Sequence, residues 1–215
     1  MTDVKTLING YQRFYNKHFV EEPGRYKELA NKGQAPKTLV IACSDSRVDP
    51  SIIMDVGPGD IFVIRNVANL VPPYQPKGDS YHGTSAALEF AVCNLGVENI
   101  IVMGHGFCAG VNALLNNQPV KNDKFSFVQS WVDISKEAKN RVEANHPDAS
   151  GEEKLHFCEK ENIKVSMENL LTFPWVKERV DNGSLEICGW YFSIFNGVLE
   201  NYDKKSDSFL PIVFK

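Results

Sequence analysis

Three short apolar runs in the first half of the chain predict buried β-strands. The runs are Thr38–Ala42, Ile61–Ile64 and Asn99–Met103, and all three are rich in β-branched residues. None of them alternates apolar with polar positions, so each is typical of a strand that is covered on both faces. Apolar residues at helical spacing over Thr84–Leu95 separate the second run from the third. Strands that alternate with helices favour parallel pairing and right-handed crossovers, and hence an α/β fold.

The two ends of the chain have a different pattern. The first 35 residues contain two helix-like stretches, Asp3–Lys17 and Gly24–Lys32, separated by a Pro-Gly break. We interpret residues 1–35 as an N-terminal helical arm. Near the C-terminus, Asn196-Gly197 separates two β-like segments, which predicts a hairpin.

The complete pattern predicts an α/β fold with a mainly parallel central sheet and flanking helices. Two of those helices are expected within residues 124–172, with a break at Asn145-His146-Pro147. The segments Ser184–Phe195 and Val198–Tyr202 are expected to form the C-terminal antiparallel hairpin at an edge of the sheet.

Composition and charge narrow the classes of function. The chain has 215 residues, of which 43% are hydrophobic and 23% are charged, which is typical of a single globular domain over residues 1–215. The net charge of −4 and the lack of a basic segment argue against a nucleic-acid partner. No apolar run approaches the roughly 20 residues of a membrane span, and Met1–Tyr15 has no signal-peptide core. We therefore expect a cytoplasmic protein without a membrane partner.

Two of the predicted strands end in residues that can bind a metal. The first ends in the sequence CSDSR, Cys43–Arg47, and the third is followed by His105 and Cys108. Each of the three residues alone is more often a core or loop residue, but carboxyl ends of parallel strands meet at one sheet edge, so we expect convergence. Two thiolates and one imidazole suit Zn²⁺, and three protein ligands leave the fourth position open, as in catalytic zinc sites.

Asp45 and Arg47 follow the first cysteine and are two positions apart. On an extended segment both side chains point to the same side, where they can pair. A surface ion pair would contribute only about 0–1 kcal/mol. Beside a metal, Arg47 could hold Asp45 away from the open position and leave one carboxylate oxygen to accept a hydrogen bond from water there.

Two other interpretations of the same residues are weaker. Gly104-x-Gly106-x-x-x-Gly110 loosely resembles a dinucleotide fingerprint, but it has one residue too many before its last glycine. A thiol hydrolase with Cys108 as nucleophile and His105 as base is also conceivable. It leaves Cys43 and the Asp45–Arg47 pair unexplained.

The two motifs together resemble the zinc signature of the β-class carbonic anhydrases. Residues 33–36, 65–74, 83–90 and 170–174 also resemble segments of that family, in the same order, so that the resemblance covers the whole chain. It implies one Zn²⁺ per chain bound by Cys43, His105 and Cys108, with Asp45 and Arg47 as the catalytic pair.

The resemblance also implies a substrate pocket and a reaction. Gln34 matches a residue that orients substrate in plant-type members, and Phe62 and Val67 match apolar pocket residues. Phe90 replaces a tyrosine that is frequent in plant enzymes, and Ala109 a glycine. The implied reaction is the reversible hydration of carbon dioxide to bicarbonate and a proton, by a homodimer or higher homo-oligomer in which the N-terminal helices pack on a partner.

The resemblance also bears on a second, regulatory bicarbonate site. Some bacterial members bind bicarbonate at a second site through a tryptophan and an arginine. Here Arg65 matches the arginine but Val40 replaces the tryptophan, which favours the plant-type open form with hyperbolic bicarbonate kinetics. The competing functions are hydrolysis of carbonyl sulfide or carbon disulfide on the same scaffold, and non-catalytic bicarbonate or zinc binding. The residues do not identify the proton shuttle.

Overall fold

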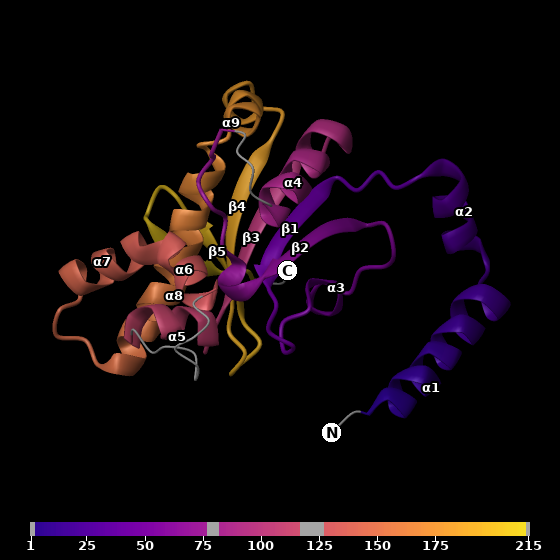
Figure 1. The fold of residues 1–215 in the computed structure, drawn as a ribbon, viewed down its shortest axis with the longest axis horizontal. Helices are drawn as coiled ribbons and strands as arrows, with labels where there is room; N and C mark the ends of the chain where they lie inside the picture. Colours follow the sequence, from indigo (N-terminus) through magenta and orange to yellow (C-terminus); the bar gives the residue numbers. More distant parts are fainter. Residues whose placement is uncertain (1–2, 77–81, 117–126, 214–215) are drawn as a thin grey trace.

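A six-stranded mixed sheet forms the centre of the molecule (Figure 1). The computed structural model describes residues 3–76, 82–116 and 127–213. The strand order is β2-β1-β3-β4-β5-β6; the first four strands are parallel and the last two antiparallel. This confirms the predicted α/β fold. The strands are β1 Thr38–Cys43, β2 Ile61–Asn66, β3 Asn99–His105, β4 Glu186–Phe192, β5 Leu199–Asp203 and β6 Ser208–Pro211.

The three apolar runs form the neighbouring strands β2, β1 and β3, each one or two residues longer than predicted. Thr38 pairs with both Ile61 and Asn99, so the three strands begin level with one another. Their carboxyl ends consequently lie together, with Cys43 as the last residue of β1 and His105 as the last of β3. This register brings the two polar motifs to one edge.

Both faces of the parallel strands are covered, which explains the continuous apolar runs. Leu39 and Ile41 face a core that α4, α8 and α9 complete, whereas Val40 and Ala42 face the opposite side, where Ile53 of α3 packs. The α-helices are α1 Val4–Tyr15, α2 Gly24–Lys32, α3 Pro50–Ile53, α4 Gly83–Glu89, α5 Ala109–Asn116, α6 Phe127–Val132, α7 Lys136–Asn145, α8 Gly151–Leu170 and α9 Pro174–Asp181.

A second core lies beneath the carboxyl ends of β1 and β3. Cys43 and Cys108 pack there with Val111 of α5, Val142 of α7 and Val165 of α8. The predicted break between the two long helices is confirmed by the gap between α7 and α8. The short α6 was not predicted, and residues 124–126 of the predicted helical region lie outside the described residues.

The N-terminal arm lies away from the sheet (Figure 1). Helix α1 continues into a π-helical turn, Asn16–Glu21, before α2, and none of these elements has a buried residue. The arm contacts the turn before β2 through Arg25, which donates to the Pro58 carbonyl and pairs with Asp60. Apolar residues at positions 4, 7, 8, 11, 14 and 15 are all exposed. They form one continuous stripe along α1, because these positions share a helix face.

The C-terminal hairpin differs from the prediction in two ways. Strands β4 and β5 are antiparallel, but six residues, 193–198, connect them rather than a two-residue Asn-Gly turn. Within this connection the Asn196 side chain accepts from the Val198 N–H, and Gly197 has a φ of 72°. The unpredicted strand β6 then pairs with β5 and forms the edge of the sheet.

Candidate metal centre

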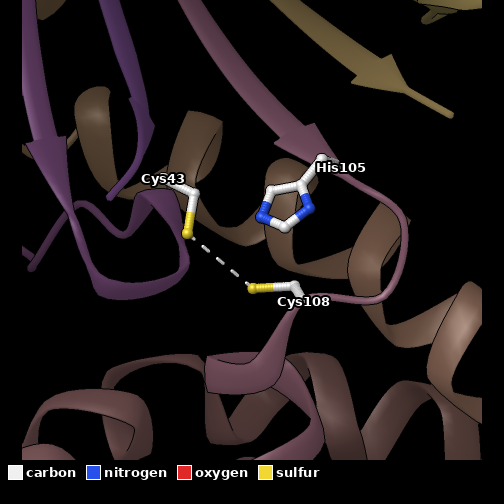
Figure 2. A group of neighbouring side chains, drawn as sticks. All are labelled: Cys43, His105 and Cys108. Atoms are coloured by element: carbon white, nitrogen blue, oxygen red, sulfur yellow. Dashed lines mark hydrogen bonds between the residues drawn. The ribbon is translucent and has the colours of Figure 1, made fainter. Parts of the chain in front are cut away.

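Cys43, His105 and Cys108 lie together at the carboxyl ends of β1 and β3 (Figure 2). Their ligand atoms all lie within 4.8 Å of one another, and all three residues are buried. The two Sγ atoms are 4.0 Å apart, too far for a disulfide of about 2.05 Å. Two thiolates that bind one tetrahedral zinc at about 2.3 Å would be about 3.8 Å apart. The observed spacing therefore fits a shared metal ion.

The imidazole of His105 is oriented so that one ring nitrogen is available to a metal ion. Its Nδ1 lies 2.8 Å from the Gly106 carbonyl oxygen, which assigns the proton to Nδ1. Its Nε2 is buried and makes no hydrogen bond with the described residues. A buried nitrogen lone pair without a partner is costly in an ordinary core. It fits a metal ligand whose other ring nitrogen is held by a carbonyl.

The pKa values of the two thiols are shifted in opposite directions. The pKa of Cys43 is lowered, chiefly because its sulfur accepts a hydrogen bond from Cys108. The same contact, together with burial, raises the pKa of Cys108. Burial alone would lower the pKa of His105, but the neighbouring Cys43 thiolate and the Gly106 carbonyl outweigh it and raise that pKa. A divalent cation would remove this competition for protons by binding both sulfurs as thiolates.

Asp45 and Arg47 form the predicted pair beside the cluster. The Arg47 Nε donates to Oδ1 at 2.9 Å and its Nη2 to Oδ2 at 2.7 Å, a bidentate contact that holds the pKa of Asp45 well below its ordinary value. The Arg47 Nη2 also donates to the Phe107 carbonyl at 3.1 Å, which joins the two ligand loops.

The reason given for this pairing was wrong. Ser46 and Arg47 form a turn rather than an extended segment, and the Arg47 backbone N–H donates to Asp45 Oδ1 at 3.0 Å. The Asp45 carboxylate therefore accepts hydrogen bonds from both the backbone and the guanidinium of Arg47.

Two residues hold the backbone of the ligand loops: Glu159, which the sequence interpretation did not name, and Arg65, which it matched only to the arginine of a second bicarbonate site. Arg65 donates to the Cys43 carbonyl at 2.9 Å, and the buried Glu159 accepts the Cys108 N–H at 2.8 Å. Glu159 also accepts the Tyr191 hydroxyl at 3.0 Å, while burial raises the pKa of Glu159. A signal for Glu159 exists in the sequence, since it is a carboxylate at helical spacing from the apolar residues Leu155 and Ile163.

Comparison with known proteins identifies the family. A family model described as Carbonic anhydrase matches residues 38–199. The chain is 39% identical over 204 residues to Beta carbonic anhydrase 3 of Arabidopsis thaliana, a match that covers 93% of this chain and 77% of the relative. The chain belongs to the β-carbonic anhydrase family.

Further relatives support this assignment. Beta carbonic anhydrase 5, chloroplastic, from the same plant is 42% identical over 184 residues, covering 86% of this chain but 60% of the relative's length. The solved β-carbonic anhydrase CcaA superimposes with a TM-score of 0.90 at 34% identity and covers 97% of this chain and 98% of that chain. A tetrameric β-carbonic anhydrase from Sordaria macrospora superimposes with a TM-score of 0.79 at 28% identity, covering 91% and 94%. None of the helices described here is long and apolar enough to cross a membrane.

In this β-carbonic anhydrase, the turn that contains Val67 borders the ligand loops. Ala68 and Asn69 have φ values of 64° and 48°, a left-handed conformation that costs free energy in non-glycine residues. The turn is held by side chains from two helices. Trp131 of α6 donates to the Val67 carbonyl at 2.7 Å, and Asn162 of α8 donates to the Ala68 carbonyl at 2.9 Å.

Gly110, two residues after Cys108, allows this turn to approach α5. A Cβ on Gly110 would lie 2.8 Å from Val67 Cγ1 and 3.0 Å from Ala68 Cβ, closer than side chains pack. We expect Gly110→Ala to lower the free energy of unfolding by about 1–3 kcal/mol, because the buried turn must shift. Gly151→Ala is the control, since a Cβ on Gly151 meets nothing within 4 Å. Urea unfolding measures both variants, and equal stability of Gly110→Ala and the wild type would contradict the expectation.

The other three residues assigned to the substrate pocket lie towards the opposite end of the sheet from the cluster of their own chain. Gln34 precedes Thr38, the first residue of β1, whereas Cys43 ends that strand, about 17 Å from Thr38 at about 3.3 Å per residue. Phe62 is four residues before Asn66, the strand neighbour of Cys43, and so lies roughly 13 Å back along β2. The Phe90 ring accompanies Phe62, with centroids 6.0 Å apart, and is 44% exposed.

Proposed function

We propose that this β-carbonic anhydrase catalyses the reversible hydration of carbon dioxide to bicarbonate and a proton, with one Zn²⁺ per chain bound by Cys43, His105 and Cys108. The observation that carries the proposal is the buried, unpartnered Nε2 of His105 facing two thiols. Bound zinc would lower the pKa of a coordinated water towards about 7 and so supply hydroxide at neutral pH.

The Asp45–Arg47 pair would orient the reacting group. Asp45 is ionised, so it can only accept hydrogen bonds, and Arg47 occupies one side of both carboxylate oxygens. Asp45 can still accept a hydrogen bond from an O–H group beside the cluster. The hydrogen of that group would then point towards Asp45, and the lone pairs of its oxygen would point towards carbon dioxide. Val67 would supply an apolar wall next to Cys108.

A second copy of the chain would complete the pocket. Phe62 lies on β2 about 13 Å back from the neighbour of Cys43, Gln34 precedes β1, and Phe90 accompanies Phe62, and both aromatic rings are partly exposed. We propose a homodimer or higher homo-oligomer in which these residues face the cluster of the partner. The tetrameric relatives from Sordaria macrospora support an oligomer.

The N-terminal arm would hold the copies together. We expect Leu7→Glu combined with Tyr11→Glu to shift the protein to a smaller assembly, because both substitutions place charge in the exposed apolar stripe of α1. Circular dichroism should remain unchanged, since no residue of α1 is buried in the chain. Asn9→Glu, outside the stripe, is the control. Light scattering measures the mass, and an unchanged mass of the double variant would contradict a role of the arm in assembly.

Metal analysis combined with a stopped-flow assay of carbon dioxide hydration tests the proposed function. We expect about one zinc per chain and hydration well above the uncatalysed rate. Bound zinc without hydration would overturn the proposal and favour non-catalytic zinc binding. Turnover of carbonyl sulfide or carbon disulfide, but not of carbon dioxide, would assign the scaffold to the competing hydrolysis. A cytoplasmic location and hyperbolic bicarbonate kinetics remain predictions.

A further inference from the structure

One guanidinium holds the backbone of the first ligand loop at two points. Arg65, on β2, donates from Nε to the Cys43 carbonyl at 2.9 Å and from Nη2 to the Asp45 carbonyl at 2.7 Å. The remaining contact of Arg65 is with Asp49, whose Oδ2 accepts from Nη1 at 2.8 Å. A single planar group therefore links the backbone of a candidate metal ligand, the backbone of Asp45 and the side chain of a third residue of the same loop.

Asp49 fixes that guanidinium through a second, separate contact. Its Oδ1 accepts the Ser51 N–H at 3.0 Å, which caps the start of α3. Helix α3 is itself held on the sheet, because Ile53 packs against the core residues Val40 and Ala42. One carboxylate oxygen of Asp49 is thus attached to a packed element and the other to Arg65. A pair as exposed as this one, with 28% and 37% of the two side chains accessible, contributes little stability by itself. The effect of the pair is instead to fix the position of the Arg65 guanidinium.

We propose that Asp49 is a positioning residue of the metal centre. By orienting Arg65, it fixes the carbonyls of Cys43 and Asp45 and keeps the Asp45 carboxylate turned towards Arg47 and away from the metal position. This inference rests on the proposed metal site. If the contact with Asp49 is lost, the Arg65 guanidinium can rotate, the Cys43–Asp45 segment loses two directed hydrogen bonds, and Asp45 gains access to the fourth position.

The Asp49→Asn variant tests the proposal, because asparagine is as good a helix cap as aspartate. When its amide oxygen accepts the Ser51 N–H, the asparagine directs its NH₂ group at Arg65. Both groups are hydrogen-bond donors, so the contact with Arg65 is lost. The probe is azide, titrated against the Co²⁺-substituted protein and followed by visible absorbance, since azide and Asp45 would compete for the same position. We expect azide affinity and kcat/KM for carbon dioxide each to fall about tenfold, with metal content unchanged.

A matched variant controls for the loss of an Arg–Asp pair as such. Asp60 also accepts a backbone N–H, that of Gly57, and pairs with an arginine, Arg25, but it contacts neither ligand loop. Asp60→Asn should therefore leave azide affinity unchanged. The Asp49→Asn substitution is also made in an Asp45→Ala background. The double variant should bind azide as tightly as Asp45→Ala alone, because the competing carboxylate is then absent.

Each outcome separates this inference from the proposed function. Wild-type azide affinity in Asp49→Asn, or an effect that persists in the Asp45→Ala background, would overturn the positioning role. A wild-type protein that binds azide through Co²⁺ but does not hydrate carbon dioxide would overturn the proposed function alone. If Asp49→Asn does not fold by circular dichroism, Asp49→Ser gives the same test, because serine retains the cap but is too short to reach Arg65.

Discussion

Replacing Cys108 with alanine should remove nearly all bound metal and reduce carbon dioxide hydration to the uncatalysed rate. The substitution leaves Cys43 and His105 as donors, and two protein ligands do not retain zinc against dialysis. We expect metal content to fall from about one ion per chain to below about 0.1. Metal analysis after dialysis against a weak chelator, with the stopped-flow assay on the same samples, measures both effects.

Cys158→Ala is the matched control for that experiment. Cys158 is fully buried in the same core, and burial raises the pKa of its thiol to about 12, so it remains a neutral thiol. Its replacement also leaves a small buried cavity, but it should not change the metal content. Full metal occupancy in Cys108→Ala would show that Cys108 is not a ligand, whereas metal loss in both variants would point to a general loosening of the core.

Replacing Arg47 with alanine should remove most of the activity while the protein keeps its metal. Without the guanidinium, Asp45 loses both bidentate hydrogen bonds and only the Arg47 backbone N–H remains as its donor. The freed carboxylate lies next to the cluster and can occupy the open position. We expect kcat/KM to fall about 100-fold, the upper range for loss of a group that orients a metal site, with zinc still at about one per chain.

Arg47→Lys distinguishes geometry from charge. Lysine keeps the positive charge but cannot make the two parallel hydrogen bonds to Asp45, so we expect it to recover only part of the lost activity. Arg25→Ala removes an arginine that pairs with Asp60 and contacts neither ligand loop of its own chain, and should leave kcat/KM per assembled site unchanged. Unchanged turnover in Arg47→Ala would show that the Asp45–Arg47 contact is an ordinary ion pair.

Much of the fold followed from local patterns. The buried strands were predictable because strands covered on both faces have continuous apolar runs, and the break at Asn145–Pro147 marked a helix boundary. Strand β6 was missed because Ser208–Pro211 is only partly buried and has no distinctive pattern. The connection after β4 was misjudged because Asn-Gly favours a tight turn, whereas here Ser193 pairs with Val198 and encloses four residues.

The candidate site divides in the same way between sequence and tertiary structure. The three candidate metal ligands and the Asp45–Arg47 pair could be predicted from the sequence, because donor chemistry and position at strand ends are local properties. Which groups hold the loops in place was decided only by the tertiary structure. Arg65 and Glu159 act on the loops through hydrogen bonds to backbone atoms, and any residue supplies such atoms, so the sequence does not show which loop either residue holds.

The tertiary structure also decided where the predicted pocket residues lie. Gln34, Phe62 and Phe90 are local matches to a pocket, but strand direction and register place Gln34 and Phe62 towards the opposite end of the sheet from Cys43, and Phe90 lies beside Phe62. The sequence alone determined which side chains are chemically suited to the site. The positions of Gln34 and Phe62 depend on the length and direction of β1 and β2, so only the folded chain could show that both lie towards the other end of these strands from Cys43.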